Sequence, residues 1–146
     1  LAESQRYGID PRMLYALMRQ ESLFNPQATS WVGARGLAQV MPATGQGIAQ
    51  SLGISDFHPD QLYQPHVSIR FGAFYIAQQV RAMNGSVPAG LAAYNGGLGN
   101  AQRWAGGSVV GDTDLFTEGI DFRETEDYVK RVYGYYGAYQ RLYGRP

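Results

Sequence analysis

The longest apolar-periodic segment of the sequence runs from Pro65 to the Asn84-Gly85 pair. Its apolar residues recur at spacings of four, three, four and three, and they are Ile69, Ala73, Ile76, Val80 and Met83. Residues at these spacings share one face of an α-helix. Phe71 and Phe74 extend the apolar surface around that helix. We therefore expect a largely buried helix that ends at Asn84-Gly85.

Proline and glycine residues set the bounds of the other expected helices. An Asp10-Pro11 start predicts a helix to about Glu21 or Ser22. Further helices are expected over residues 37–41, 42–52, 88–94, 100–104 and from about 124 onward, with loops at 30–36, 56–65 and 105–116. The buried stripe expected on the last helix is Thr125, Val129, Val132, Tyr136, Tyr139 and Tyr143. No segment alternates as a strand would, so the sequence predicts one all-α domain over residues 1–146.

The composition excludes several classes of function. Acidic and basic residues balance at 12 each, which gives no broad electrostatic reason to expect a nucleic-acid partner. The chain has no cysteine and only two histidines, so we expect no disulfide, no metal site and no cofactor. No apolar run is long enough to span a membrane. The opening Leu1-Ala2-Glu3 leads us to expect a domain excised from a longer exported protein.

Glu21 is the first candidate for chemistry. It lies at the end of the helix that starts at Pro11, on the same face as Leu14, Leu17 and Met18. A carboxyl group against apolar side chains loses solvation, which raises its pKa and suits a general acid. On the spacing alone, a helix-end glutamate that points to solvent or caps a loop amide is the favoured interpretation.

Two glycine-bearing segments add polar groups to this candidate. The loop at residues 30–36 contains Gly33 and Gly36, which permit tight turns. Farther along, Ala92-Ala93-Tyr94-Asn95-Gly96-Gly97 ends a helix with a phenol and an amide. Taken alone, each segment also fits an ordinary turn or helix cap.

Together these segments resemble a known family. Glu21-Ser22-Leu23-Phe24-Asn25-Pro26 and Gly33-Ala34-Arg35-Gly36-Leu37-Ala38-Gln39-Val40-Met41-Pro42 are similar to the first two motifs of the soluble lytic transglycosylases. Residues 92–97 resemble the third motif, and residues 118–129 resemble the fourth. All four occur in the family's order. The resemblance implies a goose-type-lysozyme-like helical domain with a glycan-binding groove.

The resemblance also implies roles for individual residues. Glu21 matches the family's acid/base catalyst. The positions that match substrate-binding residues are Ser30, Gln39, Met41, Tyr94, Asn95 and Glu118. Two residues depart from the family pattern: Ala38 replaces a larger apolar residue, and Asp121 replaces a common proline. We expect Ala38 to widen a contact beneath the loop and Asp121 to loosen the Glu118 segment.

The implied reaction is cleavage of the β-1,4 bond between N-acetylmuramic acid and N-acetylglucosamine in peptidoglycan. With one carboxyl group, Glu21 would act first as acid and then as base, and the sugar's own 6-hydroxyl would close a 1,6-anhydro ring. A hydrolytic muramidase on the same scaffold and a non-catalytic glycan-binding module remain open. The expected partners are glycan strands in the periplasm or cell wall, bound by a monomer.

Overall fold

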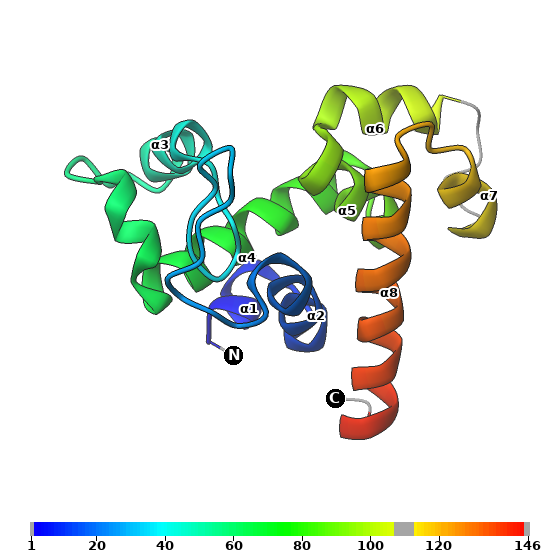
Figure 1. Cartoon of the computed structure of the whole chain (residues 1–146), viewed down its shortest axis with the longest axis horizontal. Helices are drawn as coiled ribbons and strands as arrows, with labels where there is room; N and C mark the ends of the chain where they lie inside the picture. Colours follow the sequence, from blue (N-terminus) through cyan, green and yellow to red (C-terminus); the bar gives the residue numbers. More distant parts are fainter. Residues whose placement is uncertain (1, 107–112, 145–146) are drawn as a thin grey trace. The chain divides into compact units, whose positions relative to one another are not determined.

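The structure, a computed structural model, describes residues 2–106 and 113–144, with the backbone alone at 113–115. Its helices are α1 Ala2–Tyr7, α2 Pro11–Ser22, α3 Pro42–Ser51, the 3-10 helix η1 Pro59–Tyr63, α4 Pro65–Ala82, α5 Val87–Gly96, α6 Leu98–Ala105, α7 Thr113–Glu118 and α8 Arg123–Tyr143 (Figure 1). Among the described residues, the only β pairings are two isolated bridges, Thr29 with Arg35 and Arg35 with Val40. The prediction of an all-α fold is confirmed.

The chain divides into two compact units, Leu1–Tyr75 and Ile76–Pro146, with the division inside α4. The prediction of a single catalytic domain over residues 1–146 stays a prediction. None of the described helices is both long and apolar enough to cross a membrane. The described residues also contain no cluster of three His, Asp or Glu side chains that could hold a metal ion.

The first unit is organised around α2. Asp10 caps this helix, because its carboxylate accepts a hydrogen bond from the Arg12 amide at 2.9 Å and Pro11 occupies the first helical position. Leu23 ends the helix in the left-handed conformation, with a φ of 51°. The buried face carries Leu14 and Leu17. Glu21 therefore lies in the last turn of a capped, amphipathic helix, as predicted.

The second unit is organised around α5, which lies between α6, α7 and α8. Its residues from Pro88 to Ala93 are buried, and a Cβ at Gly90 would lie 2.9 Å from the Val80 Cα atom. Only a glycine permits that approach to the end of α4. On α8 the predicted stripe is buried at Thr125, Val129 and Val132 but becomes half-buried or exposed at its three tyrosines.

Several predicted elements are wrong in detail. Residues 37–41 form a turn instead of a helix, because Gln39 has a positive φ of 50° and Arg35 pairs with Val40 through both backbone amides. The expected loop at 56–65 contains η1. α7 occupies part of the expected loop at 105–116, of which residues 107–112 lie outside the described residues. Asn95 lies inside α5, and the break comes at Gly97.

Candidate functional site

Glu21 is half-buried on the last turn of α2, one turn after the buried Leu17 and Met18. The next residue ties this helix end to the following loop. Ser22 Oγ donates to the Leu37 carbonyl oxygen at 2.8 Å, and it also lies 3.1 Å from the Met18 carbonyl oxygen. The helix end that carries Glu21 is thus hydrogen-bonded, through Ser22, to the residue that follows the glycine-bearing loop at 30–36.

The tip of that loop is closed by its own hydrogen bonds. Ser30 and Ala34 pair twice: the Ser30 amide donates to the Ala34 carbonyl at 2.9 Å, and the Ala34 amide donates to Ser30 Oγ at 3.0 Å. Gly33, with a φ of 95°, completes the turn. The Ser30 hydroxyl oxygen therefore accepts a bond from the loop itself, and its hydrogen remains a possible donor to a ligand.

The base of the loop requires glycine at position 36. A Cβ on Gly36 would overlap the Leu62 carbonyl oxygen and lie 2.9 Å from Ser68 Oγ, and the residue has a φ of 80°. The same Ser68 oxygen accepts a hydrogen bond from the buried Ala38 amide at 3.1 Å. The loop backbone thus rests directly on η1 and α4.

Gln39 and Met41 follow this contact. The Gln39 amide nitrogen donates to the Ala28 carbonyl at 3.0 Å and to the Gly36 carbonyl at 2.9 Å. Both hydrogens of the Gln39 side-chain amide are thus accounted for by hydrogen bonds within the loop. Gln39 therefore stabilises the loop conformation. Met41 is exposed at the start of α3.

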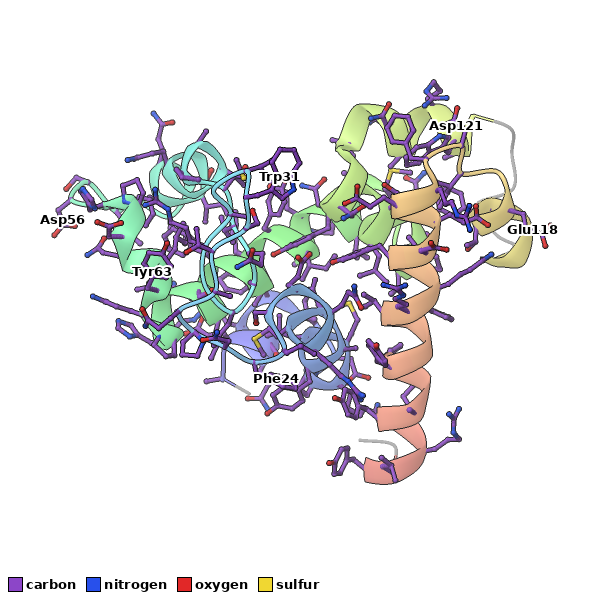
Figure 2. All side chains as sticks on the ribbon, in the orientation of Figure 1. Phe24, Trp31, Asp56, Tyr63, Glu118 and Asp121 are labelled. Carbon is purple, nitrogen blue, oxygen red and sulfur yellow. The ribbon has the colours of Figure 1, made fainter. Side chains whose placement is uncertain are left out.

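Sequence reasoning missed the aromatic side chains of this region. Trp31 is 97% exposed, and Phe24 is exposed as well. Figure 2 shows Phe24 near the start of the segment that joins α2 to α3, and Trp31 at the far tip of that segment. Arg35 forms an ion pair with Asp60 at 2.9 Å and lies over the Tyr63 ring at 5.9 Å. The sequence did carry a signal for an exposed aromatic residue here, because Trp31 lies two residues before Gly33 in a tight turn.

In the second unit, Tyr94 and Asn95 occupy the last turn of α5, and both are half-buried. Asn95 Oδ1 accepts a hydrogen bond from Thr125 Oγ1 at 2.8 Å, and Thr125 is only 2% exposed. A Cβ at Gly96 would lie 2.9 Å from that Thr125 oxygen. The amide of Asn95 is therefore held by α8 across a contact that glycine makes possible.

Glu118 is exposed at the end of α7, and Figure 2 shows it pointing away from the ribbon. It borders a cavity of about 430 Å³ that also has Lys130, Tyr133 and Arg141 in its lining. The second unit thus offers one carboxylate and two cations at the same cavity.

The prediction that Asp121 loosens the Glu118 segment is wrong. Its carboxylate accepts two hydrogen bonds from Arg103, at 2.7 and 3.0 Å, and one from Trp104 Nε1 at 2.7 Å. The Arg103 and Trp104 donors lower the pKa of Asp121 to about 2. Asp121 is therefore an anchor for this segment. Ala38 is fully buried, and the widened contact beneath the loop stays a prediction.

The predicted site residues fall into two groups, one in each unit. Glu21, Ser30, Gln39 and Met41 belong to the first unit; Tyr94, Asn95 and Glu118 belong to the second. The family model described as the transglycosylase SLT domain matches residues 1–115. This chain belongs to the transglycosylase SLT domain family. The match covers every predicted site residue except Glu118.

Named relatives agree with this assignment. The chain is 37% identical over 132 residues to the soluble lytic murein transglycosylase of Salmonella typhimurium, covering 89% of this chain and 20% of that protein. It is 39% identical over 100 residues to the transglycosylase of Enterobacteria phage PRD1, covering 68% of this chain and 34% of that protein. The chain thus spans about a fifth of the length of the Salmonella enzyme.

Solved structures agree as well. An inactive mutant of lytic transglycosylase Slt from Pseudomonas aeruginosa superposes with a TM-score of 0.89 at 35% identity, covering 99% of this chain and 24% of that one. The 70 kDa soluble lytic transglycosylase of Escherichia coli also gives 0.89, at 34% identity, over 98% of this chain and 24% of that one. The expected lysozyme-like helical fold is confirmed.

Proposed function

We propose that this chain is a lytic transglycosylase of peptidoglycan. It cleaves the β-1,4 bond between N-acetylmuramic acid and N-acetylglucosamine without water and forms 1,6-anhydromuramyl products. The observation that carries the proposal is the setting of Glu21. This half-buried carboxyl group ends the capped helix α2 and is joined by Ser22 to the Gly36 loop, in a chain whose relatives are named lytic murein transglycosylases.

A single carboxyl group fits the first unit. Its other acidic residues are Glu3, Asp10, Asp56 and Asp60. Asp10 is engaged with the backbone amide and side chain of Arg12, Asp60 pairs with Arg35, and Glu3 pairs with Arg6. Glu21 would protonate the glycosidic oxygen, and the N-acetyl group of the muramic sugar would stabilise C1. Glu21 would then accept the proton of the 6-hydroxyl as that oxygen closes on C1.

The remaining candidates would bind the glycan. Ser30 has a hydroxyl hydrogen to donate, Met41 offers an exposed apolar surface, and Gln39 holds the loop that carries both. In the second unit Tyr94, Asn95 and Glu118 supply a phenol, an amide and a carboxylate. We further infer that the protein acts as a monomer, exported to the periplasm or cell wall, where its substrate lies.

The test is digestion of purified cell-wall sacculi, followed by mass measurement of the released muropeptides. The chain is expected to release anhydro ends, and Glu21→Gln is expected to keep the fold but lose cleavage, because an amide cannot donate the required proton. Asp56→Asn, which removes an exposed carboxylate of the same unit, is the matched control and is expected to cleave normally.

Other outcomes would favour the rival functions. Products heavier by one water would identify a hydrolytic muramidase. Binding of glycan without any cleavage by the unmodified chain would identify a glycan-binding module. Near-normal cleavage by Glu21→Gln would remove Glu21 from the mechanism.

A further inference from the structure

The connection between α7 and α8 is fixed at three consecutive residues. Ile120 is buried, at 3% exposed. Asp121 accepts the three hydrogen bonds from α6. Phe122 packs edge-on against Trp104, with the ring centroids 5.3 Å apart. The connection begins directly after Glu118, so the position of Glu118 depends on these three anchors.

Trp104 joins this connection to the end of α5. The side chain is 6% exposed, and its Nε1 donates to Asp121 Oδ1 at 2.7 Å. The far edge of the same ring lies against Gly96, where an added Cβ would be 3.0 Å from Trp104 Cη2. One indole ring therefore contacts both the last turn of α5, which carries Asn95, and the connection after Glu118.

Arg103 also links the connection after Glu118 to the last turn of α5. It donates to both carboxylate oxygens of Asp121 and lies over the rings of Trp104 and Phe122 at 5.5 and 5.8 Å. Its Nη2 also lies 3.4 Å from Asn100 Oδ1, and Asn100 Nδ2 donates to the Gly96 carbonyl at 2.8 Å. A bidentate arginine pair of this kind fixes direction as well as distance. Figure 2 shows Asp121 beside the end of α6, where this cluster lies.

We propose that Asp121, held by Arg103 and Trp104, is a positioning residue that fixes Glu118 relative to Asn95 and Gly96 in the last turn of α5. Asp121 need not touch the glycan; it acts through the backbone of residues 119–120. This inference rests on the proposed function in so far as Glu118 and Asn95 bind glycan. It extends that function by assigning a role to a cluster outside the predicted site residues.

The kinetic test uses Asp121→Ala, Glu118→Gln and the double variant on a soluble glycan substrate. Glu118→Gln is expected to raise KM about fivefold, the scale of one lost hydrogen bond to a ligand, with kcat little changed. Asp121→Ala should raise KM similarly, and the double variant should be no worse than either single variant. Asp121→Asn, which keeps an acceptor for Trp104, should recover part of the loss. Glu124→Ala, which removes an exposed acid from the first turn of α8, is the control.

A second measurement keeps the inference testable without activity. The Gly119 and Ile120 amides donate to the Phe116 and Thr117 carbonyls at 3.1 and 3.2 Å. Asp121→Ala should accelerate hydrogen exchange at both amides, and Glu124→Ala should not. Unchanged exchange, or KM effects that multiply in the double variant, would overturn the positioning role. An inactive unmodified chain would instead count against the proposed function, and an unchanged KM in Glu118→Gln would count against glycan binding by Glu118. In either case the hydrogen-exchange result still decides the role of Asp121.

Discussion

The loop that carries Ser30 and Gln39 and the connection that follows Glu118 are held by different means. In the first unit, the loop at 28–41 has close backbone contacts: Arg35 pairs with Val40, and Gly36 lies against the Leu62 carbonyl. The Gln39 side chain adds two hydrogen bonds within the loop. In the second unit, the connection at 119–122 is fixed by side chains from α6. A close backbone contact such as that of Gly36 leaves no room for an added Cβ atom. A side-chain contact can lose one hydrogen bond at a time. The loop should therefore respond to substitution abruptly, and the connection gradually.

The largest effect is expected at Gly36. Gly36→Ala should lower the free energy of unfolding by at least about 2 kcal/mol, because the methyl group meets Leu62 and the residue has a positive φ. Urea unfolding measures this loss. Gly33→Ala is the control, since its φ is 95° but nothing lies within 4 Å of the added atom. Equal losses in the two variants would mean that backbone strain alone, and not the contact with Leu62, fixes the loop.

A smaller effect is expected at Thr125. Thr125→Val keeps the shape of a buried side chain but removes the donor to Asn95, so the unfolding free energy should fall by about 1 kcal/mol. The loss should nearly disappear in an Asn95→Ala background, which a double-mutant cycle measures. Additive losses would show that Thr125 acts by packing alone.

The smallest effect is expected from acid titration of Asp121. Its pKa is lowered from 3.8 to about 2, so its pairing contributes stability that is fully present above 3.8 and is lost as the pH falls through 2. The difference in Tm between the unmodified chain and Asp121→Asn should therefore be greatest above 3.8 and vanish in stronger acid. Circular dichroism melts across this range measure the difference, with Asp56→Asn as the control for net charge. A difference that persists below a pH of about 2 would contradict the charge-based anchor.

The sequence predicts those parts of the fold that depend on neighbours along the chain. The Asp10-Pro11 start and the Asn84-Gly85 end were both predictable, because capping chemistry is local. The turn at 37–41 was not, since the positive φ of Gln39 accompanies bonds to Ala28 and Gly36 that helical periodicity does not reveal.

The same limit applies to the candidate site. Glu21 and its apolar neighbours follow from helical spacing, and the structure places them as expected. The sequence predicted that Asp121 loosens its segment, whereas the structure shows it bonded to α6. The prediction failed because its partners lie 17 and 18 residues earlier on another helix. A departure from a family motif can be assessed only when its spatial neighbours are known.

The placement of Trp31 gives the chain a natural pair of fluorescent reporters. The sequence contains two tryptophans, and each compact unit holds one. Trp31 is almost fully exposed, whereas Trp104 is buried in the Asp121 cluster. Trp31 should therefore emit at longer wavelength and be quenched readily by acrylamide, while Trp104 should be shielded. Trp31→Phe would leave Trp104 as the sole indole, so that the opening of the second unit could be followed without a label, by exciting at wavelengths that the eleven tyrosines scarcely absorb.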